Sequence, residues 1–313
     1  DERVTLNEFF KELLDIPDMD NVQQGIIRLY YTGMIVINGN NALLSPLGKA
    51  MGNIRINSIE LRRAMISAYN YKCFNEVCAI TSMIEGLGSK ILDLFTTRDL
   101  DEITRLWHIE TGEFILLLDI FSEFVLREYD QVTYENGKKI KIHKIGGTKS
   151  WCKKFKINYD KMVNIYALYL ENQRSVQNVI NDQLQLHLER DVTNTEENFL
   201  LFTDKPPIIY PDVRLNVIRA LVDGYFINIM KQNANMTYTT CFPSLVRGSL
   251  DKRQSLFIHM DKEQSYKYCF YNIYASVSMT KTFNIVNGIP KILIKDIIED
   301  DNIYNIFKNC LTI

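Results

Sequence analysis

The stretch MIVINGNNALLSPLG, residues 34–48, decides the fold of the first part of the chain. Two short apolar runs flank an Asn/Gly turn, a pattern typical of a β-hairpin. Ser45 and Pro46 then supply a side-chain cap and a first-position proline, which together predict the start of a helix. Upstream, apolar residues recur at helical spacing from Val22 to Tyr30, and Gly33 stands where a glycine ends a helix.

A further apolar stripe over residues 6–14 predicts another helix, which Pro17 would stop. The resulting order of helix, helix, two-stranded wing and helix is that of a winged helix. We place this domain at residues 1 to about 55.

The helical period dominates from residue 56 to about 205 and predicts a helical bundle. The apolar stripes cover residues 59–69, 74–84, 91–94, 113–127, 160–171 and 176–189. One segment, 132–145, instead alternates around Asn136-Gly137, the strongest short signal for a β-hairpin. We expect Gly146–Ser150 to form a flexible loop that closes it.

The last part of the chain, residues 206–313, changes character again. A helix is expected over 215–230, followed by short stretches rich in aromatic and β-branched residues, such as 268–277. Several such strands within about 75 residues predict a small β-barrel. Residues 296–309 are expected to close the chain as a terminal helix. The predicted fold class is therefore mainly α with a small β-barrel.

The composition is that of a globular protein and limits the classes of partner. The 313 residues are 46% hydrophobic and 24% charged, and 36 basic against 38 acidic residues give a net charge of -2. Binding to nucleic acid must therefore come from a local patch. The apolar runs are too short to predict a membrane span, and the charged first residues predict no secretory signal. We expect a non-secreted protein of the cytosol or nucleus.

The motifs of the common catalytic and metal sites are missing from the sequence. It contains no P-loop, no G-x-S-x-G, no H-E-x-x-H and no G-x-G-x-x-G, and Gly146–Ser150 has P-loop residue types in the wrong order. Six cysteines without a C-x-x-C pair and four histidines predict no zinc site. We therefore expect no catalytic residue, metal ligand or cofactor within these residues.

Five stretches, in order along almost the whole chain, resemble the C-terminal region of the DEAH-box (DExH-box) RNA helicases. Leu44–Met51 is similar to the family's L-T-x-L-G-x-x-M, and Trp151–Tyr159 to its W-C-x-x-F-I-N. Ile218–Asn228 resembles A-L-x-x-G-Y-F-x-N, the helix that leads into the family's barrel. The other two matches are the helix pair at 65–80, in which Cys73 precedes Glu76, and the segments 238–240 and 280–283, which stand where the family has barrel strands.

The resemblance implies a winged helix, a ratchet-like helical bundle and an OB-fold. It implies an accessory region that binds and guides single-stranded RNA, or DNA, and regulates two RecA-like motor lobes of the same parent chain. ATP and Mg²⁺ would be used by those lobes and not here. A composition rich in Ile, Asn and Lys resembles versions from large DNA viruses, for which a virion-associated location is a further expectation. The family's H-P-S-S and R-x-Q-L motifs have no counterpart in this sequence.

The resemblance also implies barrel residues that would line a strand of nucleic acid, since such a lining needs basic side chains and stacking surfaces. These candidates are Tyr238, Arg247, Lys252, Arg253, Thr280 and Lys281. For each of these residues, a position on an ordinary exposed barrel surface is as good an explanation as contact with nucleic acid.

The segment 127–148 is longer than its counterpart in the family and is predicted to be a basic insertion. Residues 138–156 contain eight lysines and no acid, a formal charge of +8. Such a concentration is typical of a nucleic-acid contact, and the alternative is a solvated loop. The binding candidates in this stretch are Lys138, Lys139, Lys141, Lys144 and Lys153.

Other interpretations of the sequence stay open. Trp107 and Trp151 could each stack on a base, although Trp151 is better explained as a core residue. The rival function is a non-enzymatic interaction module that docks a helicase activator or a transcription factor. Binding of duplex DNA by the winged helix is less favoured, because residues 21–31 carry a single basic residue, Arg28.

Overall fold

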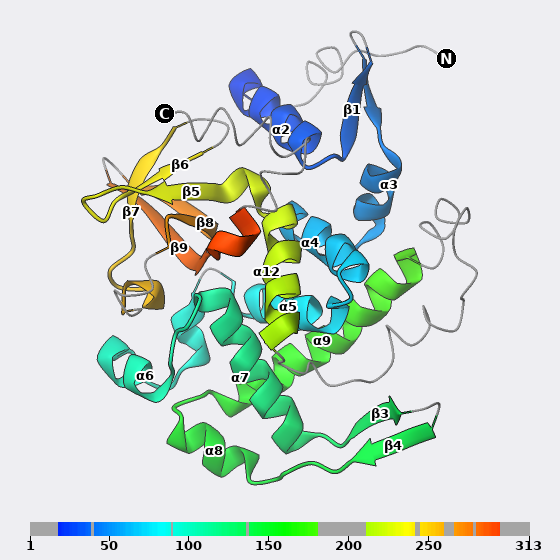
Figure 1. Cartoon of the computed structure of the whole chain (residues 1–313), viewed down its shortest axis with the longest axis vertical. Helices are drawn as coiled ribbons and strands as arrows, with labels where there is room; N and C mark the ends of the chain where they lie inside the picture. The colour runs from blue at the N-terminus through cyan, green and yellow to red at the C-terminus, as the bar shows by residue number, and fades with distance from the viewer. Residues whose placement is uncertain are drawn as a thin grey trace. The chain divides into compact units, whose positions relative to one another are not determined.

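A computed structural model describes residues 18–38, 41–88, 90–135, 138–180, 211–241, 245–259, 266–277 and 280–294. The chain divides into two compact units, residues 1–52 and 53–313 (Figure 1). The helix predicted over 6–14, the domain boundary near 205 and the terminal helix predicted over 296–309 lie outside the described residues.

The first unit contains the hairpin and the capped helix that the sequence predicts. Its elements are α2 (Met19–Tyr31), β1 (Ile35–Asn38), β2 (Asn41–Leu44) and α3 (Pro46–Asn53). Ser45 Oγ accepts the backbone N–H of Gly48 at 2.8 Å and donates to the carbonyl of Gly33 at 2.6 Å. The same hydroxyl thus caps α3 and ties it to the end of α2, where Gly33 adopts a φ of 74°.

The helices of the second unit pack around α5. They are α4 (Ile59–Asn70), α5 (Phe74–Leu87), the short 3₁₀ helix η1 (Ile91–Leu94), α6 (Leu100–Leu106), α7 (Glu113–Glu128), α8 (Thr148–Lys154), α9 (Tyr159–Val179) and α12 (Pro211–Gly224). α5 is buried along nearly its whole length against α4, α7, α9 and α12, and the buried residues include the polar Asn75, Glu76, Thr81 and Ser82 besides its apolar side chains.

Four of these helices, α6, α8, α9 and α12, differ from the prediction. α6 and α8 are additional to the predicted elements, and α9 is continuous where two helices, 160–171 and 176–189, are predicted. The helix predicted over 215–230 ends at Gly224. A Cβ at that position would lie 2.3 Å from the carbonyl oxygen of Glu60, so the glycine permits a close approach of α12 to α4.

The chain then enters a closed five-stranded barrel. A short 3₁₀ helix, η3 (Phe226–Asn228), leads into β5 (Ile229–Gln232), β6 (Tyr238–Thr240), β7 (Arg247–Leu250), β8 (Tyr268–Val277) and β9 (Thr280–Gly288). The strand order is β5-β6-β7-β9-β8, closed by β8 on β5. Only the β7–β9 pair is parallel among these strands. The predicted combination of helices and a small barrel is confirmed.

The barrel interior is apolar and tightly filled. Its buried cluster consists of Met230, Tyr238, Leu250, Phe257, Cys269, Phe283 and Val286. Because side chains alternate across a strand, each of the short strands contributes one or two inward residues to this core.

Glu113, the first residue of α7, joins the helices to the barrel. Its side chain is fully buried and accepts hydrogen bonds from four donors: the backbone N–H groups of Leu256, Phe257 and Val286 and the hydroxyl of Ser255. Ser255, Leu256 and Phe257 lie in or beside η4 (Leu256–His259), whereas Val286 lies on β9. One carboxylate therefore holds two barrel segments on the end of a helix.

Candidate nucleic-acid interface

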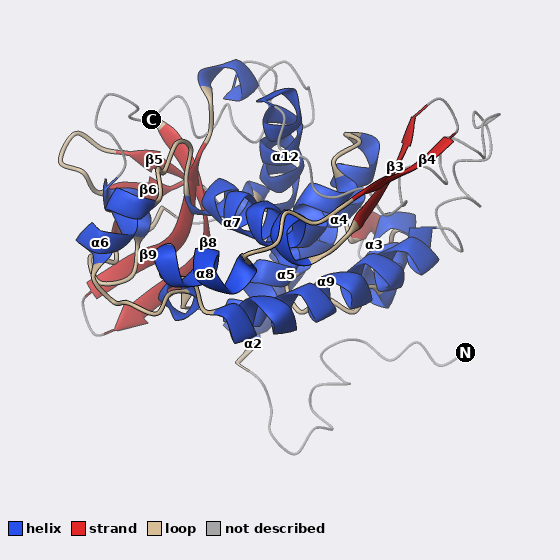
Figure 2. Cartoon of the chain, turned by 90° about the horizontal axis from the view of Figure 1, so that it is seen from below, coloured by secondary structure: helices blue, strands red, loops and turns tan. Residues whose placement is uncertain are grey.

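The predicted basic hairpin is present. β3 (Gln131–Glu135) pairs with β4 (Lys138–Ile142) in antiparallel register, with Glu135 opposite Lys138. It projects from the helices at the end away from the barrel in both views of the chain (Figure 2). Lys138 and Lys139 belong to β4, and their side chains lie outside what the structure describes.

Asp130 places an acid at the base of this hairpin. Its carboxylate lies 2.9 Å from Lys141 Nζ and accepts the backbone N–H of Lys144 at 2.9 Å. These two interactions lower the pKa of Asp130 to about 2, so it is ionised at neutral pH. Lys141 is thus partly neutralised by a residue outside the basic stretch.

The segment after the hairpin is anchored to α7. Ile145 and Gly146 donate their backbone N–H groups to the carbonyls of Leu126 and Arg127, both at 3.0 Å. Gly146 and Gly147 take φ values of 79° and 70°, a conformation that favours glycine. The flexible loop predicted for 146–150 is therefore limited to its glycines, because Thr148–Ser150 form the first turn of α8.

The far end of α8 is anchored as well. Ile157 forms a β-bridge with Phe95, and Lys156 Nζ pairs with Glu102 at 3.2 Å. The basic stretch 138–156 is thus divided into a projecting hairpin and a helix held at both ends.

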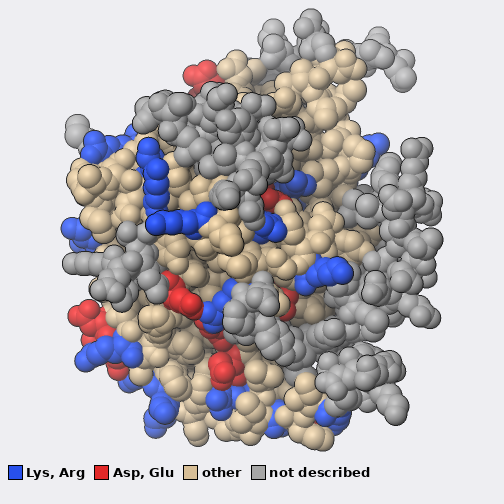
Figure 3. Space-filling model, in the orientation of Figure 1, with Lys and Arg blue, Asp and Glu red and all other residues tan. Residues whose placement is uncertain are grey.

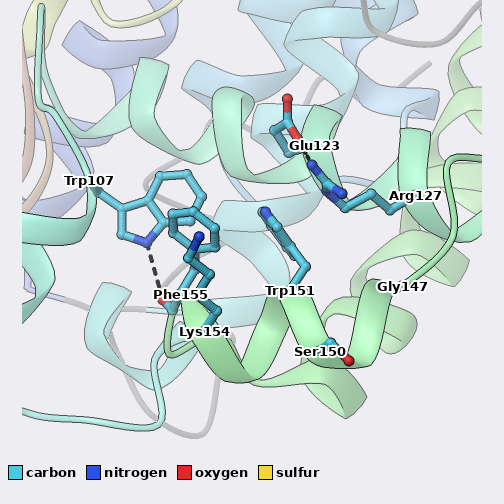
Figure 4. A pocket seen from close by; sticks show the side chains of 8 residues that line it. All are labelled: Trp107, Glu123, Arg127, Gly147, Ser150, Trp151, Lys154 and Phe155. Carbon is cyan, nitrogen blue, oxygen red and sulfur yellow. Dashed lines mark hydrogen bonds and ion pairs between the residues drawn. The ribbon is translucent and has the colours of Figure 1, made fainter.

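A cavity of about 500 Å³ lies between α7 and α8 (Figure 4). Trp107, Trp151 and Phe155 form one cluster of rings in it, with centroids 5.2 to 5.9 Å apart. The indole N–H of Trp107 donates to the carbonyl of Phe155 at 3.3 Å. Trp107 and Phe155 are half-buried, whereas Trp151 is 8% exposed, in agreement with its interpretation as a core residue.

Arg127 borders these rings from α7. Its guanidinium lies 5.5 Å from the centroid of the Trp151 ring and 3.2 Å from the carboxylate of Glu123. Figure 4 shows Trp151 between Trp107 and Arg127. The stacked cation is therefore fixed in place by an i,i+4 ion pair.

A second cavity, of about 300 Å³, adjoins the first and shares Arg127, Gly147 and Ser150 with it. Lys144, Lys149 and Tyr159 also line it. We call the two cavities together the α7–α8 groove; its ring end is formed by Trp107, Trp151 and Phe155, and its basic end by Lys144 and Lys149.

The charges of the α7–α8 groove are unbalanced. Arg127, Lys144, Lys149 and Lys154 line it, against Glu123 and Glu128. Glu128 accepts a hydrogen bond from the hydroxyl of Tyr159 at 2.9 Å. Within the described residues, the exposed amines of Lys144, Lys149, Lys153 and Lys154 form no ion pair. The groove therefore carries excess positive charge.

The barrel candidates fall into three places. Tyr238 is 3% exposed and packs in the barrel core, and this burial raises its pKa. Its ring packs against other side chains of the barrel core and is not accessible to a strand of nucleic acid. The aromatic type predicted a stacking surface, but the residue alternates inward on β6.

Arg247, Thr280 and Lys281 are exposed and lie together. The parallel register of β7 and β9, with Ser249 opposite Thr282, puts Arg247 beside Thr280. Lys252 and Arg253 are exposed too, but they follow the other end of β7, beyond Leu250. The barrel therefore offers two small basic sites and not one.

The one face drawn in Figure 3 does not separate by charge. On the face drawn in Figure 3, basic and acidic side chains lie next to one another. In the described part of the chain, no helix combines the length and apolar character needed to span a bilayer. Within the same residues, no group of three or more His, Cys, Asp or Glu side chains is arranged to hold a metal ion.

The sequence did not single out Arg127 or Lys149 as site residues. Arg127 stands at the end of an amphipathic helix, where a cation is common. Its Glu123 partner four residues earlier is the only local signal, and the approach to Trp151 depends on how α8 folds back. No protein-family model matches this sequence, and no curated protein is similar enough to count as a relative.

Proposed function

We propose that this chain is the C-terminal accessory region of a DExH-box RNA helicase, which binds and guides single-stranded RNA and regulates the motor lobes. The observation that carries the proposal is the position of α12. The segment Ile218–Asn228, which resembles the family's helix before its barrel, spans the end of α12 and leads directly into a closed five-stranded barrel.

The finer fold assignments belong to this proposal. A helix, a two-stranded wing and a capped helix in residues 19–53 support a winged helix. A closed barrel of five strands in the order β5-β6-β7-β9-β8 supports an OB-fold. The helices between them, α4 to α9, would form the ratchet-like bundle.

The chemistry of binding would be electrostatic and sequence-tolerant. Exposed lysines on the hairpin and α8, together with Arg247 and Lys281 on the barrel, would neutralise phosphates. ATP and Mg²⁺ would bind to the motor lobes. The described residues do not fit that role, because Lys149 lies over the ring of Tyr159 at 5.2 Å and follows no P-loop.

The test is single-strand binding by this chain, measured by fluorescence anisotropy against single-stranded RNA, single-stranded DNA and duplex over a salt titration. Preference for single strands, with affinity falling as salt rises, supports the proposal. Equal affinity for duplex, or no binding, contradicts it. An open reading frame upstream of Asp1 that encodes a P-loop and a D-E-x-H box would support the motor-lobe partnership.

A non-enzymatic protein-docking module is the second candidate, and the wing favours it. Val36, Ile37, Leu43 and Leu44 on the β1–β2 hairpin are each about half exposed, at 49 to 57%. Apolar side chains gathered on one exposed hairpin are typical of a protein contact, such as one with a helicase activator or a transcription factor. A chain that binds no single strand and whose gene begins here would favour this candidate.

A further inference from the structure

The α7–α8 groove combines half-buried aromatic rings with the lysines Lys144 and Lys149, which form no ion pair within the described part of the chain. The rings of Trp107 and Phe155 remain partly exposed within a cavity of about 500 Å³. The adjoining cavity of about 300 Å³ is bordered by the exposed Lys144 and Lys149. Backbone hydrogen bonds hold α8 at both ends, so its anchoring does not depend on the excess positive charge.

We propose that this groove is a nucleotide subsite, in which a base stacks at the ring end and the attached phosphate contacts Lys144 and Lys149 at the basic end. The inference rests on the proposed binding of single strands and names one place where a strand is held. A nucleotide joined in a strand and a free nucleotide share this chemistry.

The charge of the groove selects an anionic ligand. Both acids that line it already have partners, since Glu123 pairs with Arg127 and Glu128 accepts from Tyr159. An uncharged apolar peptide would fill the ring end but leave the lysines facing one another. A planar group joined to a phosphate satisfies both ends, because aromatic stacking and phosphate neutralisation are the two terms of single-strand binding.

Arg127 stands where the two cavities meet and supports this assignment. Its Nε is buried, and no hydrogen-bond acceptor for it exists among the described residues. Buried polar groups normally have a partner, so an orphaned donor at a cavity border points to an acceptor supplied from outside. Because Nε itself is covered, the guanidinium would have to turn toward the groove for a phosphate or a base oxygen there to accept from it.

The chain carries its own reporter for this site. It has two tryptophans, Trp107 and Trp151, and both line the ring end. Tryptophan emission from the folded chain therefore comes from the groove. Titration with oligoadenylate should quench the emission to saturation. A second titration with adenosine monophosphate tests whether a free nucleotide binds. Titrations with an abasic strand and with polyglutamate test whether negative charge without bases is enough.

Charge reversal at the basic end tests the phosphate contact. Lys144→Glu with Lys149→Glu should weaken oligoadenylate binding and reduce the slope of log affinity against log salt by about 1.4, from about 0.7 for each lost phosphate contact. The matched control is Lys49→Glu with Lys90→Glu. It changes the net charge by the same amount at two exposed lysines that do not line the groove. The control should bind as the wild type does.

Removal of a ring tests the base contact. Trp107→Ala should weaken oligoadenylate binding about tenfold, whereas Trp107→Phe keeps a stacking surface and most of the affinity. Thermal unfolding of each variant shows whether the fold is retained, and the lysine variants keep the test valid if Trp107→Ala does not fold.

The outcomes separate the two proposals. If oligoadenylate binds by anisotropy but leaves the emission and the groove variants unaffected, the subsite is overturned and the proposed function stands. If oligoadenylate does not bind while adenosine monophosphate quenches to saturation, the subsite stands and the proposed function fails. Quenching by the abasic strand or by polyglutamate equal to that of oligoadenylate overturns the subsite, because charge alone would then explain it. No binding in any arm overturns both.

Discussion

A glutamate lies near each end of α7, and the two glutamates serve different purposes. At its first turn, Gly112 and Glu113 are enclosed by η4 and β9, and the carboxylate of Glu113 accepts from four donors. At its last turn, Glu123 and Arg127 form a half-exposed ion pair beside an open groove.

The difference shows that a carboxylate's surroundings decide whether it stabilises a fold or remains available to a ligand. A buried carboxylate that accepts three backbone N–H groups and one hydroxyl cannot be replaced without leaving those donors without partners. An exposed ion pair contributes little to stability and can exchange its partner for a ligand. The first end of α7 therefore fixes the barrel, whereas the ion pair at its last turn can exchange partners when a ligand enters the groove.

Glu113→Ala tests this comparison with the largest expected effect. Three backbone N–H groups would lose their acceptor in a dry site, which should lower the free energy of unfolding by about 3 to 5 kcal/mol. Glu123→Ala at the other end of α7 should cost less than about 1 kcal/mol. Urea unfolding followed by tryptophan emission measures both, and equal losses would contradict the contrast.

Two glycines extend the comparison to the backbone. Gly112 has a φ of 149°, and a Cβ there would lie 2.5 Å from Cα of Asn287. Gly147 has a φ of 70° but open space around it. Gly112→Ala should therefore lower the free energy of unfolding by about 3 kcal/mol, and Gly147→Ala by about 1 kcal/mol. A reversed order in urea unfolding would show that the barrel end of α7 tolerates a shift.

The free energy of unfolding should depend on pH through the buried Glu113 at the first turn of α7. Burial raises the pKa of Glu113 from 4.5 to about 7, against the opposing effect of its hydrogen-bond donors. The folded state then holds a proton that the unfolded state releases over this range, so raising the pH lowers the free energy of unfolding.

The expected loss between about pH 5.5 and 7.5 is about 1 to 2 kcal/mol. Burial also raises the pKa of Asp119 to about 6, and this change acts in the same direction. Glu113→Gln should remove most of the dependence, as measured by urea unfolding at the two pH values. A stability that rises over this range would contradict the assignment of a protonated Glu113.

The hairpin lysines should affect binding and leave stability unchanged. Replacing Lys138, Lys139, Lys141 and Lys144 by Glu should weaken single-strand binding about tenfold and flatten its salt dependence. The urea midpoint should stay that of the wild type, because the hairpin lies outside both cores. Binding that is unchanged across a salt titration would remove the hairpin from the interface.

Local patterns predicted the elements well where local chemistry determines them. The Ser45-Pro46 cap, the hairpin at 34–44 and the strand at 268–277 all depend on neighbouring residues. The end of α12 was predicted six residues too late, because Gly224 marks a contact with Glu60, 164 positions earlier, that no local period reveals.

The site was harder to predict for the same reason. The excess of lysines is visible in the sequence, but the joining of Arg127 to Trp151 requires α8 to fold back onto α7. Glu113 carries no signal at all, since its donors lie 142 to 173 positions away. Tyr238 shows the converse, because residue type alone does not tell an inward ring from an outward one.

The hydrogen bonds from Ile145 and Gly146 to the last carbonyls of α7 bring the chain back to the point from which it departed. Residues 129–144 therefore leave the end of α7 and return to it, so that the two ends of this segment lie close together. Evolution can lengthen, shorten or exchange such a segment without repositioning the helices that bear it. Related proteins could thus gain or lose the lysine-bearing β3–β4 hairpin without a change in the helical core.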